Sequence, residues 1–269
     1  MSLQSLFLTL ARGAAAAALG LACASPALAA DKPLRIGLIP SVANAATELA
    51  VAEARKAGLE VELVEFNDWV LPNIAVADGS VDANFFQHEP FLQLFNARRG
   101  ANLTPIAYGY STTIGLFSKK LKKGQPLPDG ATIAVPNDPT NGGRALLLLQ
   151  ANGLIKLRPE AGLKATPIDV IENPKKLRFI ELDAAQLPRS LDDTDASAVN
   201  TNFALEAGLN PATDAIAQES PNSPYANVLV VREKDKDRPE FAKLVSIYHS
   251  PAVKQFIETK FKGAVVAAW

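Results

Sequence analysis

The chain has 269 residues, a formal net charge of −1 and 48% hydrophobic residues. This length and composition are sufficient for one large or two smaller domains with hydrophobic cores. The near-neutral charge gives no support for nucleic-acid binding, which would need a basic stripe, and we expect no nucleic-acid partner.

The first 30 residues have the organisation of an export signal that is cleaved from the mature protein. A short leader reaches Arg12, an Ala- and Leu-rich run follows to Ala24, and Ala27-Leu28-Ala29 forms a cleavage site of the small-x-small type. The apolar run is too short to span a membrane, which needs ~20 apolar residues. The sequence therefore predicts a periplasmic protein whose mature form begins near Ala30 or Asp31.

The only cysteine, Cys23, lies inside this signal. It is either lost on cleavage or is the lipidated residue of a bacterial lipoprotein, which would anchor the protein to a membrane. Lipoprotein signals usually place Leu three residues before the cysteine, where this chain has Gly20, so we favour cleavage. A mature chain without cysteine would have no disulfide, no thiol nucleophile and no thiolate metal site.

The first half of the mature chain alternates apolar strands with helices. A strand–helix–strand order predicts right-handed parallel crossovers. Strands are expected at 34–39, 61–66, 81–86, 104–108 and 113–118, and helices at 44–57, 71–79 and 90–99.

The second half continues this alternation. Its strands are near-continuously apolar, which favours an α/β fold with mostly parallel sheets. Strands are expected at 131–136, 177–182, 196–200 and 226–232, and helices at 140–150, 184–191, 201–208, 239–249 and 251–261.

One loop-to-helix junction in this half has the composition of an anion site. Thr140 or Asn141 could cap the helix, and Gly142 and Gly143 would leave its first turn open to close approach. Arg144 adds a guanidinium at the same place. Free N–H groups, the helix dipole and this cation would together suit a carboxylate or phosphate. The alternative is an ordinary capped helix with a solvated arginine.

The sequence contains little that suggests catalysis. His88 is one of two histidines, and Asp82 and Glu89 near it do not form a dense cluster of metal ligands. No Gly-x-Ser-x-Gly nucleophile motif is present. We therefore expect neither an enzyme nor a bound metal or cofactor.

Six blocks, spread in order along the mature chain, closely resemble the NlpA-type methionine-binding proteins, the substrate-binding components of bacterial methionine ABC importers. The resemblance implies a two-lobed periplasmic-binding-protein fold of type II, with the ligand clamped between lobes that the chain crosses twice. Lobe 1 would comprise residues 31–115 and 228–269, and lobe 2 residues 116–227. The blocks are Phe66–Asn73, Asp82–His88, Pro136–Arg144, Leu154–Lys156, Glu181–Leu191 and Ser223–Asn227.

The resemblance also implies the ligand, the partners and the site. The ligand would be methionine, and the partners would be an ABC permease and its ATPase; we expect a monomer. Arg144 would hold the amino-acid carboxylate, and Asn side chains can both accept from an ammonium and donate to a carboxylate. Aromatic rings suit a thioether sulfur. The implied ligand-binding residues are Trp69, Phe86, His88, Phe91, Asn141, Arg144, Asn200, Asn202 and Asn227.

Two of these positions depart from the family, which commonly has Tyr where this chain has Trp69 and Phe91. Both changes keep the pocket aromatic but alter its hydrogen-bonding groups, which could change the preference between L- and D-methionine or favour a derivative. Simple packing within a lobe is the alternative role for each ring. Three other functions stay open: a binding protein for another amino-acid-like or anionic ligand, an enzyme on the same scaffold, and a lipoprotein with a vestigial pocket.

Overall fold

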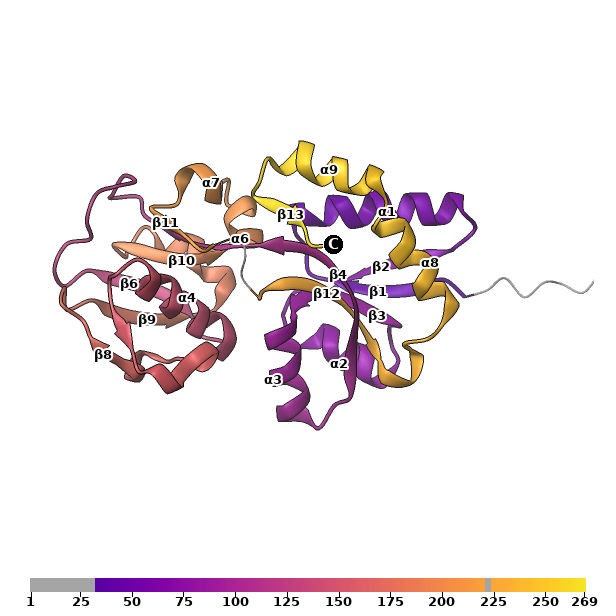
Figure 1. Cartoon of the computed structure of the whole chain (residues 1–269), viewed down its shortest axis with the longest axis horizontal. Helices are drawn as coiled ribbons and strands as arrows, with labels where there is room; N and C mark the ends of the chain where they lie inside the picture. The colour runs from indigo at the N-terminus through magenta and orange to yellow at the C-terminus, as the bar shows by residue number, and fades with distance from the viewer. Residues whose placement is uncertain (1–31, 221–223) are drawn as a thin grey trace, which may run out of the picture. The chain divides into compact units, whose positions relative to one another are not determined.

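A computed structural model describes residues 32–220 and 224–269 of the chain, which fold into two mixed β-sheets flanked by helices (Figure 1). The predicted cleavage site and Cys23 lie outside the described residues, as does Ser223. Within the two described ranges, no helix is long and apolar enough to cross a membrane.

The first sheet has six strands in the order β13-β4-β12-β3-β1-β2. The pairs β1–β2 and β1–β3 are parallel, and the pairs of β12 with β3 and β4, and of β13 with β4, are antiparallel. The strand bounds are β1 Leu34–Leu38, β2 Val61–Glu65, β3 Ala83–His88, β4 Leu103–Thr112, β12 Ala226–Arg232 and β13 Val265–Ala267.

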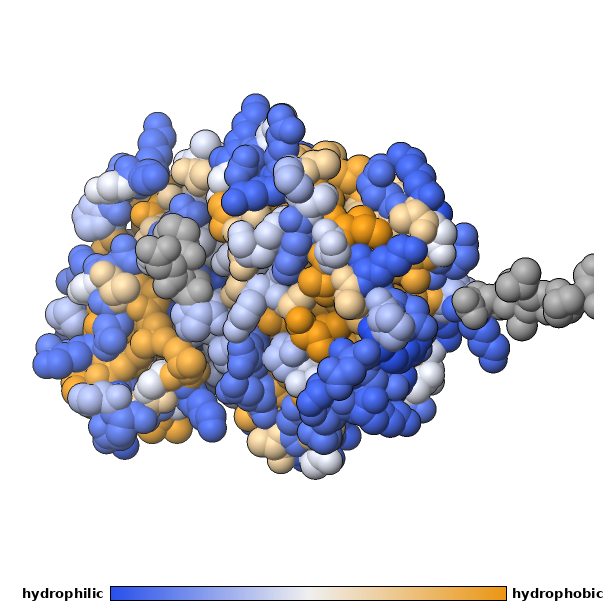
Figure 2. Space-filling model, turned by 45° about the vertical axis from the view of Figure 1, so that its right-hand side comes forward, coloured by the Kyte–Doolittle hydropathy of each residue, from blue (hydrophilic) through white to orange (hydrophobic). Residues whose placement is uncertain are grey.

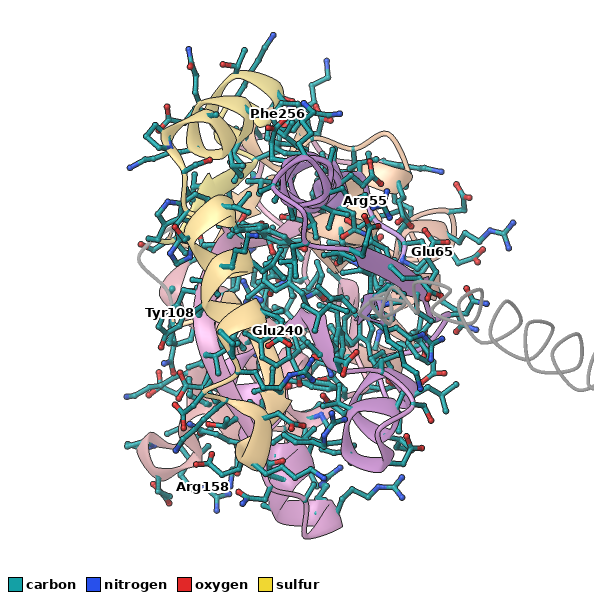
Figure 3. All side chains as sticks on the ribbon, turned by 90° about the vertical axis from the view of Figure 1, so that its right-hand side faces the viewer. Arg55, Glu65, Tyr108, Arg158, Glu240 and Phe256 are labelled. Atoms are coloured by element: carbon teal, nitrogen blue, oxygen red, sulfur yellow. The ribbon has the colours of Figure 1, made fainter. Side chains whose placement is uncertain are left out.

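Helices cover both faces of this sheet. Buried residues of α1, α8 and α9 share one core with β1 and β2, and α2 and α3 share a second core with Val228 and Val230 of β12. Figure 3 shows α8 and α9 lying over the first of these faces, with Phe256 on α9. The helix bounds are α1 Ala45–Lys56, α2 Leu71–Asp78, α3 Glu89–Arg99, α8 Pro239–Tyr248 and α9 Pro251–Phe261.

The second sheet has five strands in the order β11-β5-β10-β6-β9. α4 packs on one face, and α5 and α6 pack on the other. A separate two-stranded sheet pairs β7 with β8. The bounds are β5 Ile114–Phe117, β6 Thr132–Pro136, α4 Pro139–Ala151, β7 Lys156–Leu157, β8 Val170–Glu172, β9 Arg178–Leu182, α5 Leu187–Ser190, β10 Ala196–Asn200, α6 Thr201–Glu206, α7 Pro211–Asp214 and β11 Ala217–Gln218.

The chain passes between the two sheets twice. The first passage is at Thr113, between β4 of the first sheet and β5 of the second, and the second passage lies between Gln218 and Ala226. The predicted lobe boundaries, at 115/116 and 227/228, remain predictions and fall inside β5 and β12. The strand pairing places the whole of β5 in the second sheet and the whole of β12, including Asn227, in the first.

Hydrophobic side chains are concentrated in four internal clusters. The face shown in Figure 2 is mostly hydrophilic, with hydrophobic groups in smaller areas. Exposed large hydrophobic side chains among the described residues include Ile168, Ile171 and Ile180.

The predicted α/β fold is confirmed, but the strands are not mostly parallel. Each sheet has only two parallel pairings. The pairings of β12 and β13 in the first sheet, and of β5 in the second, are antiparallel. The prediction of a strand at 81–86 was also displaced, because β3 extends to His88. The short strands β7, β8, β11 and β13 were not predicted.

Candidate functional site

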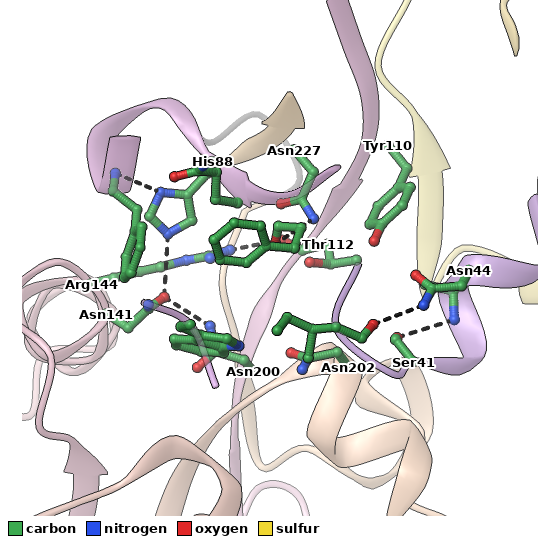
Figure 4. Close-up of a pocket in the computed structure, with 16 residues that line it drawn as sticks. Ser41, Asn44, His88, Tyr110, Thr112, Asn141, Arg144, Asn200, Asn202 and Asn227 are labelled. Atoms are coloured by element: carbon green, nitrogen blue, oxygen red, sulfur yellow. Dashed lines mark hydrogen bonds between the residues drawn. The ribbon is translucent and has the colours of Figure 1, made fainter. Parts of the chain in front are cut away.

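A small cavity of about 50 Å³ is lined by residues from both sheets (Figure 4). All nine residues predicted as ligand contacts line it. Their role in binding remains a prediction, but the structure does bring them together. Trp69, Phe86, His88, Phe91 and Asn227 come from the first sheet and its connections, and Asn141, Arg144, Asn200 and Asn202 from the second.

His88 ends β3 and caps the helix α3. Its Nδ1 accepts the backbone N–H of Phe91 at 3.2 Å, so this nitrogen is unprotonated and the ring proton of the neutral form is on Nε2. Nε2 faces Oδ1 of Asn141 at 3.3 Å. Burial lowers the pKa of His88 to about 3, and the nearby charge of Arg144 acts in the same direction. The ring is therefore neutral at physiological pH and donates to Asn141.

The orientation of Asn141 determines that of Asn200. Nδ2 of Asn141 donates to the Asp138 carboxylate, and its Oδ1 accepts from Nδ2 of Asn200 at 2.8 Å. The amide oxygen of Asn200 is consequently turned away from Asn141. This oxygen is buried and has no hydrogen-bond partner within the described part of the chain. Asn200, which lines the cavity, thus keeps an unsatisfied buried acceptor.

Arg144 is the cation of the site and is only 2% exposed. Its Nη2 donates to the backbone oxygen of Thr112 at 2.7 Å, and its Nε and Nη2 donate to Glu219. The guanidinium lies over the ring of Tyr225, at 4.1 Å from the centroid. Arg144 is therefore not a solvated arginine, and the alternative of an ordinary capped helix with an exposed charge is excluded.

The helix N-terminus itself does not offer the predicted anion site. The N-cap of α4 is Asp138, and not Thr140 or Asn141 as the sequence had predicted. The carboxylate of Asp138 already accepts the backbone N–H of Asn141. A Cβ on Gly142 would meet the oxygen of Pro136 at 2.8 Å, and one on Gly143 the oxygen of Leu163 at 2.5 Å. These glycines permit close packing of the protein backbone, so Arg144 alone remains from the predicted anion site.

Aromatic rings form one wall of the cavity. Trp69 stacks on Phe203 of α6, with centroids 5.5 Å apart, and meets Phe91 edge-on at 6.1 Å. Phe86 meets Phe91 edge-on at 6.0 Å. A second cavity, of about 420 Å³, is also lined by Trp69, Phe91 and Phe203. Trp69 and Phe91 line both cavities, so these two rings lie between the small cavity and the larger one.

Several lining residues were missed by the sequence analysis. Ser41 and Asn44 follow the carboxyl end of β1, where ligands commonly bind in α/β sheets, so their position could have identified them. Tyr110 and Thr112 end a strand that was predicted to stop at residue 108. Burial raises the pKa of Tyr110 to about 12, although a hydrogen bond with Asn227 opposes the shift. Its hydroxyl therefore stays protonated.

The described residues contain no group of three or more His, Cys, Asp or Glu side chains that could hold a metal ion. The site is instead made of one buried cation, several amides and an aromatic wall.

The chain forms two lobes and passes between them twice, and residues from both lobes line a small cavity. These features define a substrate-binding protein of the two-lobed class. The family model for the NlpA lipoproteins matches residues 34–269. The chain belongs to the NlpA lipoprotein family.

Relatives of known name and structure cover most of the chain. The D-methionine-binding lipoprotein MetQ of Escherichia coli K12 is 46% identical over 239 residues, which are 88% of each chain. A nutrient-binding protein from Burkholderia cenocepacia, solved with bound methionine, is 49% identical with a TM-score of 0.84, and the match covers 88% of this chain and all of that one. Lipoprotein Tp32 from Treponema pallidum is 34% identical with a TM-score of 0.85, over 88% of this chain and all of that one.

Proposed function

We propose that this protein captures methionine between its lobes and delivers it to an ABC importer. The observation that carries the proposal is that two residues lining one small cavity have a buried guanidinium and an unsatisfied buried amide oxygen, Arg144 and Asn200. An α-amino acid supplies the matching groups, a carboxylate and an ammonium, on adjacent carbons.

The carboxylate would bind at Arg144. Hydrogen bonds between charged groups are stronger than neutral ones, and Arg144 is almost fully buried, which reduces competition from water. The ammonium would satisfy Oδ1 of Asn200. An unpaired buried acceptor costs about 1–3 kcal/mol, so a ligand that supplies a donor recovers this free energy on binding.

The side chain would lie against the aromatic wall. Phe86, Phe91 and Trp69 present ring edges and faces, and a thioether sulfur makes favourable contacts with aromatic edges. The names of the relatives support the same ligand: the E. coli protein is named for D-methionine, and the Burkholderia structure contains methionine.

Delivery to a permease and its ATPase fits the binding-protein class, and the structural relatives include a periplasmic substrate-binding protein of an ABC transporter from Coxiella burnetii. We propose that the protein acts outside the cytoplasmic membrane and binds its ligand without chemical change. Relatives named as lipoproteins support lipidation of Cys23 over its removal, contrary to our preference from the sequence. The intact mass of the exported protein distinguishes the two forms.

Calorimetric titration of ligand-stripped protein with L- and D-methionine tests the function. We expect saturable binding that Arg144→Ala weakens ~100-fold or more, because the variant leaves the ligand carboxylate buried without its cation. Arg158→Ala is the matched control, since Arg158 is a half-exposed surface residue paired with Glu160 and Asp169. Equal affinity of the unmodified and Arg144→Ala proteins would refute the role of Arg144. Binding of other amino acids or simple anions in preference to methionine would refute the assigned ligand.

A further inference from the structure

Arg144 already has a carboxylate partner within the protein. Glu219 follows β11 and accepts from Nε of Arg144 at 3.0 Å and from Nη2 at 2.5 Å. The side chain of Glu219 is only 12% exposed, and Oε2 also accepts the backbone N–H of Ile114 at 3.3 Å. Glu219 does not line the cavity, so it faces the guanidinium from behind.

The donors of Arg144 can be accounted for one by one. A guanidinium has five N–H donors, one on Nε and two on each Nη. Nε and Nη2 are directed to Glu219 and to the oxygen of Thr112. Nη1 makes no hydrogen bond within the described residues, so its two donors are those left for a ligand carboxylate.

The pair of Arg144 and Glu219 also sets the charge of the site. Among the residues that the structure describes, Arg144 is the only Lys, Arg, Asp or Glu that lines the cavity, and the lining histidine, His88, is neutral. Asp138 lies behind Asn141, at the positive end of the α4 dipole. With Glu219 ionised, the guanidinium is neutralised before any ligand enters. A ligand that carries only a negative charge would then bring an uncompensated charge into a buried site.

We infer that Glu219 is a specificity-determining residue that makes the cavity select net-neutral zwitterions over monoanions. It holds the guanidinium with Nη1 free, and its charge excludes anions that lack an ammonium. This inference rests on the proposed function and identifies the chemical class of ligand that the site accepts.

The test compares methionine with 4-(methylthio)butanoate, which keeps the carboxylate and thioether and lacks the ammonium. Dissociation constants for both are measured by calorimetry on the unmodified protein and on two neutral variants, Glu219→Gln and Glu219→Leu. The unmodified protein is expected to bind methionine at least 100-fold more tightly than the anion. In either neutral variant that folds, this ratio is expected to fall at least tenfold. Glu160→Gln, at an exposed position, should leave it unchanged.

If Glu219 only held Arg144 in position, its substitution would weaken the binding of both ligands equally and leave the ratio of their dissociation constants unchanged. An unchanged ratio in a folded neutral variant, or a ratio below tenfold in the unmodified protein, therefore overturns the inference alone. Absence of methionine binding by the unmodified protein would refute the proposed function and the inference with it.

Discussion

Asn200 combines two roles that a single mutation can separate. Its Nδ2 donates to Asn141, and its buried Oδ1, which has no partner among the described residues, is the proposed acceptor for the ligand ammonium. We expect Asn200→Ala to weaken methionine binding at least tenfold, because the ligand ammonium would lose its acceptor, with a smaller change in thermal stability. The contrasting variant is Asn96→Ala, which removes hydrogen bonds to the backbone of Leu103. It should lower the melting temperature and leave the affinity unchanged; the opposite pattern would contradict the assignment.

His88 should make the stability of the protein depend on pH. Its pKa falls from 6.5 to about 3 in the folded state, so the unfolded chain binds a proton that the folded chain does not. The stabilisation is complete above pH 6.5 and is lost as the pH falls toward 3, with a slope of up to ~1.4 kcal/mol per pH unit. His88→Gln should flatten this dependence between pH 6.5 and 4 in urea unfolding. An equal slope in both proteins would show that His88 is not the titrating group.

At the scale of single residues, the sequence pointed to residues that line one cavity, but it could not identify their hydrogen-bond partners. All nine predicted residues line one cavity. Glu219 could not be predicted as the partner of Arg144, because 75 positions separate them and only the fold brings them together. The unpaired oxygen of Asn200 likewise depends on a chain of hydrogen bonds that runs from His88 through Asn141 to Asn200. His88 and Asn200 belong to different sheets, so only the fold brings them together.

The cap of α4 links an element to the site. Asp138 accepts from the backbone of Asn141 and from its side chain, so it fixes both the helix start and the orientation of the amide. We expect Asp138→Ala to destabilise the protein by about 1 kcal/mol, as for other caps, and also to weaken methionine binding several-fold. Ser250→Ala removes the cap of α9 and is the control. It should destabilise the protein without changing affinity; a parallel loss of affinity in both variants would point to a general effect of stability.

Long elements were predicted with errors of one to a few residues, because their apolar periodicity and capping residues are local signals. α1, α3, α8 and α9 all lie close to their predicted ranges. Strands β7 and β11 have two residues each, and β8 and β13 three, which is too short for a periodic pattern. The antiparallel pairings were missed for another reason. The direction of a pairing depends on which two strands lie side by side, and the residue pattern of a single strand does not show this.

At the scale of the molecule, an aromatic contact joins the two lobes beside the cavity. Trp69 lies between β2 and α2 of the first lobe, and its stacking partner Phe203 belongs to α6 of the second. Aromatic pairs contribute about 0.5–1.5 kcal/mol beyond the area they bury. If this contact stabilises the closed form, Phe203→Ala should weaken methionine binding two- to tenfold while the melting temperature of the free protein changes little. Titration followed by calorimetry checks this, and unchanged affinity would show that the stack is not part of closure.

The two-lobed architecture followed from resemblance over the whole mature chain and could not have been derived from strand patterns alone. Alternating strands and helices indicate an α/β fold, but they do not show where a chain divides into lobes. The passage at Thr113 is marked by no unusual composition, and the Ser-, Pro- and Asn-rich run at 220–224 signals a loop but not a passage between lobes. Both passages become visible only in the pairing of β5 and β12 with different sheets.

A crystal structure of the protein with bound methionine is the direct test of the proposed binding mode. We expect a carboxylate oxygen of the ligand within hydrogen-bonding distance of Nη1 of Arg144, with Glu219 still paired to Nε. We also expect the ammonium against Oδ1 of Asn200 and the thioether against the aromatic wall. Methionine bound outside this cavity, or bound with its ammonium toward Arg144, would contradict this binding mode.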